Sequence, residues 1–481
     1  MPAISGEEYI KRVDQLHSEI WLDGTKVTGE LSKHKAFSGV IQTQSQLYDL
    51  QLDQSIIDKM TFPSPSSGDK VGVSFLEPRT IEDLALRRFM IQTWAKASGG
   101  MLGRSPDYMN TALMSIASSA DILSKQDASF TKNLERYFEF VRENDLCMTH
   151  TFINPQVNRS KIYYENDKEI IVAQPIKKTS EGFIIKGARL LATQGGITDE
   201  ILVLPSQAAS YNDDLAYGFA IPSNTPGLKF ICRESFAYDH SKFNHPLGSQ
   251  FEEMDAIVVF DDVLVPWERV FFYNHPEIAY NIYSESSFFP LITHHVLCRR
   301  VVKTEFILGI AQLLVETINV SEYQHVQEKI SEIIVGLETL KSLLLTSELN
   351  ARSNKWNIMI PEENAVKVAA TIFPRIYPRF MEIFQQIGAS GLASIPTEGD
   401  FSSEIKPDLQ LYLQAAGANA EEKVKLFRLA WDASMSAFGT RQTLYERFFF
   451  GDPIRLSSGL YQSYDLSSST SFVKDFLARD K

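Results

Sequence analysis

Two short stretches of the sequence contain residue types that could do chemistry. Arg104 and Tyr108 lie four apart in Gly103-Arg-Ser-Pro-Asp-Tyr108, a spacing that puts both polar ends on one side of a helix. His150 lies in Thr149-His-Thr-Phe-Ile-Asn-Pro-Gln156 and could take or share a proton, because imidazole titrates near neutral pH. On spacing alone, a surface arginine, a half-buried tyrosine anchor and a hydrogen-bonded structural histidine are the more ordinary interpretations.

The elements that must position these residues fall into successive parts. Residues 1–145 are predicted to form a mainly helical domain, in which Ile81 to Trp94 shows helical spacing of apolar residues and Thr80 is a suitable N-cap. Residues 146–280 contain short runs of β-branched and aromatic residues separated by Gly, Asn, Asp and Pro. They predict a central antiparallel β domain, a barrel or a sandwich, with strands near 170–173, 182–187, 201–205, 217–222, 228–232 and 256–263.

Residues 281–455 are predicted to be helical again. Long amphipathic segments at 301–320, 323–350, 362–387 and 420–449 indicate a four-helix bundle, and Pro374 and Pro378 should kink or divide the third. Residues 456–481 are expected to form a tail that lies over another surface. Segregated helical and β parts indicate an α+β multidomain protein and not an alternating α/β sheet.

Composition excludes several classes of protein. The 481 residues are 44% hydrophobic and 22% charged, and the net charge of −13 disfavours nucleic acid as a partner. No run of about 18 apolar residues predicts a membrane span, and Glu7, Glu8 and Lys11 stand where a secretory signal would be apolar. Three widely spaced cysteines fit a reducing compartment, so a cytoplasmic location is expected. Phosphate-binding glycine motifs are missing, which favours a cofactor held between domains.

The layout and several motifs resemble a known family. Beside the two stretches above, the sequence contains Thr193-Gln-Gly-Gly196, Phe260-Asp-Asp-Val-Leu-Val-Pro-Trp267 and Gly451-Asp-Pro453. From Glu7 to about Arg455 the chain resembles the acyl-CoA dehydrogenase architecture, and within it the oxygenase component of the 4-hydroxyphenylacetate 3-hydroxylase family. The Arg-Ser-Pro-Asp-Tyr and His-Thr-x-x-Asn-Pro-Gln motifs carry most of this resemblance.

The resemblance implies a flavin-dependent monooxygenase. Such oxygenases take reduced FAD as a diffusible co-substrate from a separate flavin reductase and use dioxygen. They hydroxylate a phenol such as 4-hydroxyphenylacetate beside its existing hydroxyl, giving a catechol. The family implies a homo-oligomer, a dimer of dimers built through the helical bundle, and no metal.

The resemblance also assigns residues. His150, Arg104 and Tyr108 would be catalytic and would contact the substrate hydroxyl and the flavin. Ser206 and Gln207 would bind the substrate tail from the loop at 205–214, although this loop could be an ordinary strand connection. FAD would be held by His150 together with Asn154, Gln156, Val157, Asn158, Arg159, Thr193, Gly451 and Asp452. The resemblance implies that Gly451 and Asp452 come from a neighbouring subunit.

 Asn154 and Pro155 could equally be an ordinary turn, and Phe448 to Phe450 are expected in the core.

Other functions are open to the same sequence. A 4-hydroxybutyryl-CoA dehydratase shares the architecture but needs cysteines for an iron–sulfur cluster, and none lies between Arg104 and Tyr108. An acyl-CoA dehydrogenase would use a glutamate such as Glu446 as its base, but Arg447 and Phe448 replace the small residues expected after it. A helical scaffold protein would leave the motifs unexplained. No metal site is predicted, because the adjacent His294 and His295 diverge on a helix and the group Asp239, His240 and His245 has no familiar ligand spacing.

Overall fold

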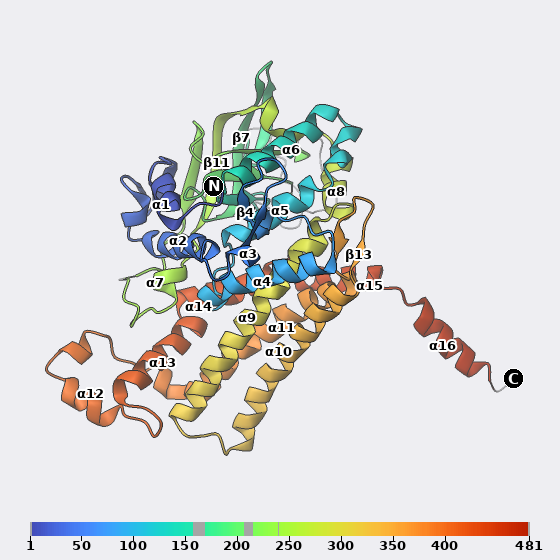
Figure 1. Cartoon of the computed structure of the whole chain (residues 1–481). Coiled ribbons are helices and arrows are strands. Elements are labelled where there is room, and N and C mark those ends of the chain that lie inside the picture. The colour runs from blue at the N-terminus through green and yellow to red at the C-terminus, as the bar shows by residue number, and fades with distance from the viewer. Residues whose placement is uncertain (1, 157–168, 206–214, 239, 480–481) are drawn as a thin grey trace.

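The sheets and the long helices occupy opposite ends of the molecule (Figure 1). The computed structural model describes residues 2–156, 169–205, 215–238 and 240–479. Two β-sheets and the N-terminal helices lie at the top of Figure 1, and the long helices extend below them. The α+β class and the order helical, β, helical are therefore as predicted, while the domain boundaries at 145, 280 and 455 stay predictions.

The N-terminal part is built from helices with well-defined starts. In α4 (Ile81–Ala97), the Thr80 hydroxyl accepts from the Asp83 N–H at 3.1 Å and the Asp83 carboxylate accepts from the Thr80 N–H at 3.0 Å. This capping box confirms the predicted helix start. The other helices of this part are α1 (Gly6–Asp14), α2 (Ser38–Gln51), α3 (Ile57–Met60), α5 (Pro106–Ala117) and α6 (Ala128–Glu143).

Helix α5 begins later than the spacing of Arg104 and Tyr108 suggests. Pro106 occupies its first turn, so Arg104 lies in the turn before the helix while Tyr108 lies inside it. Proline is well suited to this position because its missing N–H would have no partner in the helix. The two side chains therefore do not meet as neighbours on one helical face.

The larger sheet has six strands in the order β2-β1-β10-β11-β7-β6. Its centre is the pair of long antiparallel strands β7 (Gly182–Thr193) and β11 (Asp255–Pro266). The N-terminal part contributes two strands, and β1 runs parallel to β10. The remaining members are β1 (Glu19–Leu22), β2 (Thr25–Lys26), β6 (Gln174–Lys178) and β10 (Leu228–Cys232).

The smaller sheet has the order β12-β9-β8-β5. Strands β5 (Met148–Thr151) and β8 (Glu200–Val203) are parallel, and both β8 with β9 (Gly218–Pro222) and β9 with β12 (Val270–Phe272) are antiparallel. Phe183 and Phe260 of the large sheet meet Phe219 of the small one, with ring centroids 5.8 and 6.2 Å apart. The two sheets thus pack against each other through aromatic side chains.

The predicted β domain differs from the structure in two respects, although the two facing sheets agree with the predicted sandwich. Among the described strands of this part no closed barrel is found. The sheets are not wholly antiparallel, because the chain between β5 and β8 is long enough for the crossover that a parallel pair requires. Residues 170–173 form no strand, and Val172 makes only an isolated bridge to Ala188.

The long helices form a bundle with one unexpected break. They are α9 (Phe288–Thr317), α10 (Gln324–Leu349) and α11 (Glu363–Gly388). Helix α11 continues through Pro374 and Pro378, although each proline removes a backbone hydrogen bond, and its buried Phe373, Tyr377 and Phe380 favour continuity through packing. The predicted helix at 420–449 is instead divided into α13 (Ala420–Ser434) and α14 (Ala437–Phe448).

The break before α14 has a local cause. The Ser436 hydroxyl accepts from the Gly439 N–H at 3.0 Å and so caps the second helix. Shorter elements complete this part and the links to the sheets. They are β3 (Thr61–Pro63), β4 (Lys70–Gly72), α7 (Gly248–Phe251), α8 (Pro276–Ser284), β13 (Arg352–Ser353), β14 (Met359–Ile360) and α12 (Lys406–Tyr412).

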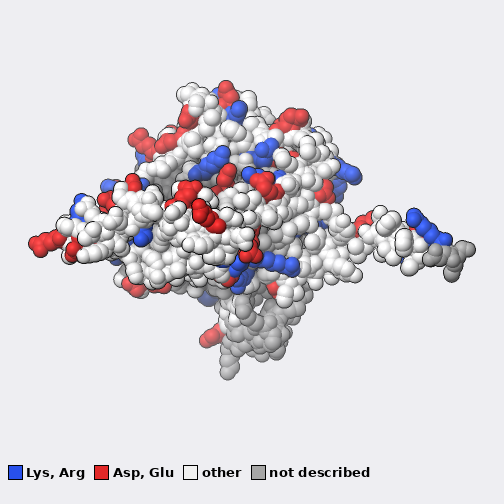
Figure 2. Space-filling view, turned by 90° about the horizontal axis from the view of Figure 1, so that it is seen from below, with Lys and Arg blue, Asp and Glu red and all other residues white. Residues whose placement is uncertain are grey.

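The C-terminal segment leaves the body of the chain. Helix α15 (Pro453–Ser463) lies along α11, where the Arg375 side chain donates to the Ser457 hydroxyl at 3.1 Å. Helix α16 (Ser467–Leu477) projects away from all other elements (Figures 1 and 2). Every described residue from 464 to 479 is exposed, so only the part of the expected tail that lies in α15 covers a surface of its own chain.

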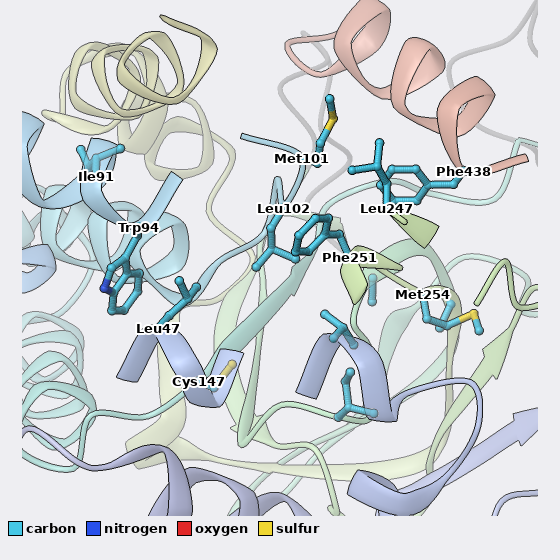
Figure 3. Packing of buried hydrophobic residues seen from close by; sticks show 14 of the residues in the cluster. Leu47, Ile91, Trp94, Met101, Leu102, Cys147, Leu247, Phe251, Met254 and Phe438 are labelled. Carbon is cyan, nitrogen blue, oxygen red and sulfur yellow. The ribbon is translucent and has the colours of Figure 1, made fainter. Parts of the chain in front are cut away.

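The hydrophobic core fixes the turn that carries Arg104. Met101 and Leu102 are buried, and they lie beside Phe438 of α14 and the residues Leu247 and Phe251 around α7 (Figure 3). The chain entering Gly103 is therefore anchored to both the β part and the bundle. No helix among the described residues is long and apolar enough to span a membrane.

Candidate active site

Arg104 is held at both its backbone and its side chain. Its N–H donates to the Glu253 carboxylate, and its carbonyl accepts from the Gln194 amide at 3.1 Å. The guanidinium lies 4.3 Å from the ring centroid of Tyr108 and 4.7 Å from that of Phe449, and Nη1 donates to the Tyr445 hydroxyl at 2.9 Å. Its Nε is buried and has no hydrogen-bond partner among the described residues. Part of this cation is therefore free to meet a ligand.

Tyr108 lies in the middle of the cluster. It is 4% exposed, and its ring centroid is 5.7 Å from that of Phe449 and 6.0 Å from that of His150. Burial raises the pKa of Tyr108, although the positive charges of Arg104 and Arg299 oppose this. Its hydroxyl is thus a neutral group that can donate a hydrogen bond.

His150 comes from β5 and faces the same cluster. Its ring stacks on that of Phe152, with centroids 4.1 Å apart and 12° between the planes. Nδ1 and Nε2 are both buried, and neither has a hydrogen-bond partner within the described chain. Burial, with a further contribution from Arg104, lowers the pKa of His150 well below its usual value. The imidazole is therefore neutral near pH 7, and its unprotonated nitrogen can accept a hydrogen bond.

The structure brings the three predicted residues together from three different elements. Buried polar atoms in folded proteins nearly always have partners, so unsatisfied atoms on both His150 and Arg104 indicate a place for a polar ligand. The Oδ1 atom of Asn154, four residues after His150, is also buried without a partner in the described chain. These atoms could form hydrogen bonds with a polar ligand placed among them.

The predicted flavin residues on the sheet are engaged with protein atoms. The Thr193 hydroxyl, at the end of β7, donates to Asp255 at 2.8 Å, so its proton is already used, while its oxygen can still accept. A Cβ on Gly195 would come within 2.7 Å of Phe230, and one on Gly196 within 2.6 Å of Ile20. The close packing at these glycines is therefore against the protein itself.

The remaining predicted residues are exposed or lie outside the described ranges. Gly451 has φ +92°, and Asp452 is exposed and caps α15 by accepting from the Ile454 N–H at 3.0 Å. Gln156 is exposed. Outside the described residues lie Val157, Asn158, Arg159, Ser206 and Gln207.

Phe152, Tyr445 and Phe449 belong to the cluster, and sequence reasoning did not select them. Two signals could have found them. Phe152 follows His150 by two residues, the spacing that keeps side chains on one face of extended chain. Phe449 follows Tyr445 by four, a helical neighbour spacing, and their ring centroids are 5.1 Å apart. Phe449 packs partly buried against the core, as expected, and also contacts Arg104, whereas Phe448 is 49% exposed, so the core expectation was wrong for Phe448.

Comparison with known proteins identifies the family. Models of the N-terminal and C-terminal parts of 4-hydroxyphenylacetate 3-hydroxylase match residues 5–272 and 279–478. The chain belongs to the 4-hydroxyphenylacetate 3-hydroxylase family. It is 54% identical over 480 residues to a protein of Bacillus subtilis named probable 4-hydroxyphenylacetate 3-monooxygenase, covering 100% of this chain and 99% of the relative. The predicted family membership is confirmed.

Solved structures agree with this assignment. The oxygenase component of 4-hydroxyphenylacetate 3-monooxygenase complexed with FAD and 4-hydroxyphenylacetate is 41% identical, with a TM-score of 0.95 and 99% of each chain covered. A 4-hydroxybutyryl-CoA dehydratase from N. maritimus has a TM-score of 0.88 over 98% of this chain and 95% of its own, at 19% identity. The dehydratase therefore shares the fold.

Glu446 of this chain is poorly suited to act as the base that an acyl-CoA dehydrogenase uses to remove a proton. Its buried carboxylate is 3.0 Å from Arg299, 3.0 Å from Arg300 and 2.8 Å from Lys303. Burial alone would raise the pKa of Glu446, but the three cations outweigh it and hold the pKa far below its usual range. A carboxylate so strongly stabilised is a poor base, and it links α14 to α9 instead.

The two adjacent histidines of α9 pair with different carboxylates. His294 lies 2.9 Å from Glu348, and His295 lies 2.8 Å from Asp107. His294, Glu348 and Cys298 do come together, with their ligand atoms within 4.8 Å of one another. However, Arg88 contacts both oxygens of Glu348, at 2.9 and 3.0 Å, so this carboxylate already has a cation. The absence of a metal stays a prediction.

Proposed function

We propose that this chain is the oxygenase component of a two-component phenol hydroxylase. It takes reduced FAD from a separate flavin reductase and uses dioxygen to hydroxylate a phenol, such as 4-hydroxyphenylacetate, beside its existing hydroxyl. The observation that carries this proposal is the convergence of Arg104, Tyr108 and His150 with buried, unsatisfied nitrogen atoms on Arg104 and His150. The related oxygenase complexed with FAD and 4-hydroxyphenylacetate supports both the cofactor and the substrate class.

Arg104, His150 and Tyr108 prepare the phenol. Reduced FAD, when bound, supplies the electrons that activate dioxygen for transfer to the ring. Arg104 stabilises negative charge on the phenol oxygen, and the neutral His150 accepts the proton from that oxygen. Tyr108 donates a hydrogen bond from its neutral hydroxyl and limits the orientations of the ring. Removing the proton makes the ring more electron-rich, which favours attack by an electrophilic oxygen.

Further residues would hold the cofactor and the substrate tail. Asn154, with its unsatisfied Oδ1, and Thr193, with its free acceptor capacity, are proposed to contact the flavin. Ser206 and Gln207 are proposed to bind the carboxylate of the substrate. The other proposed contacts with FAD are Gln156, Val157, Asn158, Arg159, Gly451 and Asp452.

The chain is also proposed to act as a homo-oligomer. Helix α16 projects from the body with Phe472 69%, Phe476 60% and Leu477 69% exposed. Apolar side chains gathered on a projecting helix are typical of an element that packs on another subunit. Gly451 and Asp452 directly precede α15, the helix that comes before this arm, and they are proposed to reach the flavin of a neighbouring copy. The dimer of dimers is the proposed arrangement.

The partners and location follow from the same chemistry. A flavin reductase is the proposed source of reduced FAD. Acidic and basic side chains are interspersed on the face shown in Figure 2, and the net charge of −13 offers no attraction to nucleic acid. The buried cysteines Cys147, Cys232 and Cys298 are unpaired, which suits the proposed cytoplasmic location.

The experiment combines the purified chain with FAD, NADH, dioxygen and any flavin reductase. With 4-hydroxyphenylacetate, we expect the catechol to form in proportion to the reduced FAD consumed. Phenylacetate, which lacks the hydroxyl, is the control and should give only hydrogen peroxide. The proposal fails if no phenol in a panel yields a catechol while reduced FAD is delivered at the same rate.

A further inference from the structure

Tyr445 contacts Arg104 but is not among the predicted site residues. We infer that Tyr445 is a positioning residue, which holds the Arg104 guanidinium toward the phenol hydroxyl through its own hydroxyl group. The inference rests on the proposed function, because it concerns how one residue of that site is oriented. It adds a positioning role for α14, an element that supplies none of the three predicted catalytic residues.

The hydrogen bonds of Tyr445 have only one possible polarity. The Arg104 guanidinium can only donate, so the Tyr445 hydroxyl accepts its Nη1–H at 2.9 Å. The single proton of that hydroxyl is directed to the Gly103 carbonyl at 3.3 Å. Tyr445 therefore ties the side chain of Arg104 to the backbone of the residue before it. Phenylalanine at this position would remove both bonds and keep the ring.

The neutrality of Tyr445 preserves the charge of Arg104. Burial raises the pKa of Tyr445 to about 12, although Arg104 and Arg299 oppose this, so the hydroxyl stays protonated at neutral pH. No carboxylate of the described residues forms an ion pair with the Arg104 guanidinium. Glu253 contacts Arg104 at its backbone N–H instead. A carboxylate partner would neutralise the guanidinium, whereas a phenol orients it without cancelling its field. The cation therefore remains available to a phenol oxygen.

The Tyr445 ring is itself fixed from several sides. The side-chain cations of Arg299, Lys303 and Arg441 lie 5.4, 6.0 and 5.3 Å from its centroid. Two of these cations are paired with Glu446, the next residue of α14. A ring held by paired, buried cations has little freedom to rotate. The orientation of Tyr445 is thus set by the bundle and passed to Arg104.

Gly103 permits the close approach that this contact requires. A Cβ at position 103 would lie 2.6 Å from the Tyr445 hydroxyl oxygen, which is closer than real side chains come. The preceding Met101 and Leu102 pack beside Phe438, which is also on α14 (Figure 3). Three successive residues of the turn, Met101, Leu102 and Gly103, therefore pack against α14.

The test compares Tyr445→Phe with the matched control Tyr377→Phe. Tyr377 is buried on α11, its ring lies 4.8 Å from Lys303, and its hydroxyl has no partner in the described chain. We expect Tyr445→Phe to lower kcat/KM for 4-hydroxyphenylacetate about tenfold, as the loss of a hydrogen bond to a charged group implies. The anaerobic Kd of 4-hydroxyphenylacetate in the presence of reduced FAD should rise similarly. Tyr377→Phe should leave both values within about twofold.

A double-mutant cycle with Arg104→Ala separates positioning from general structure. If Tyr445 acts through Arg104, Tyr445→Phe has little further effect on the Kd once Arg104 is removed. Equal losses in the two backgrounds, or Tyr445→Phe behaving like Tyr377→Phe, would overturn the inference. Full hydroxylation by Arg104→Ala would instead overturn the proposed site itself, so the two failures are distinguishable. Thermal unfolding of each variant checks that the fold is retained.

Discussion

The imidazole of His150 stacks on the ring of Phe152, with centroids 4.1 Å apart and 12° between the planes, so one face of the imidazole is covered. Its two nitrogen atoms lie at the ring edge and are buried without a partner in the described chain. The stack therefore fixes the ring plane while it leaves the proton-accepting edge available. This arrangement supports the proposed role of His150 toward the phenol hydroxyl.

Replacing His150 with alanine should uncouple oxygen use from hydroxylation. We expect His150→Ala to bind reduced FAD but to form catechol at least ~100-fold more slowly, the usual contribution of a positioned base, with hydrogen peroxide as the main product. Catechol and peroxide are measured per reduced FAD consumed. Phe152→Leu is the control, since it keeps the imidazole and should cause a smaller loss. Full coupling in His150→Ala would show that this residue has no essential role.

The protonation of His150 should also be visible in the stability of the fold. Burial and Arg104 lower its pKa in the folded state, while the unfolded value is about 6.5. As pH falls below about 6.5, the unfolded chain binds this proton first, so the free energy of unfolding decreases. His150→Phe lacks this titration. Its Tm should therefore fall less than that of the unaltered chain between pH 7.5 and 5.5, and parallel curves would contradict the assignment.

Local sequence signals predicted the helices better than the sheets. Thr80 and Asp83 begin α4 as expected, because a capping box involves only neighbouring residues. The parallel pairing of β5 with β8 depends on where the intervening chain goes, which period and propensity do not encode. Helix α11 passes through Pro374 because burial of its apolar face offsets the lost bond. These differences arise from tertiary packing.

The site residues likewise divide into those that local motifs indicate and those that only tertiary packing brings together. Arg104, Tyr108 and His150 were selected by motif resemblance, since their spacing alone favoured ordinary structural roles. Tyr445 is 341 positions from Arg104, and only the packing of α14 against the turn brings them together. Nothing in the local sequence indicates such a contact. A single sequence therefore predicts the residues within a motif. The residues that contact them from distant parts of the chain, such as Tyr445, are found only in the structure.

Breaking the buried charge cluster should destabilise the bundle strongly. In Glu446→Gln, three cations lose the carboxylate that lies 2.8 to 3.0 Å from them. Uncompensated buried charge costs about 3–5 kcal/mol, so the Tm should fall clearly. Glu338→Gln is the control, because Glu338 pairs with Lys341 at 3.0 Å on an exposed face and should cost about 1 kcal/mol or less. Similar Tm values for the two variants would show that the cluster contributes little.

Removing the projecting arm should change the assembly and not the fold of the subunit. Helix α16 has no buried residue in its own chain, so truncation after Ser463 removes no intrachain core contact. If α16 packs on a second subunit, sedimentation velocity should show a smaller species or a concentration-dependent mixture. The double substitution of Phe472 and Phe476 by aspartate should act in the same direction, because charge in an apolar interface is costly. Lys474→Ala is the control for a polar change on the same helix. Truncated protein that keeps the assembly size of the full chain would place the subunit contacts elsewhere.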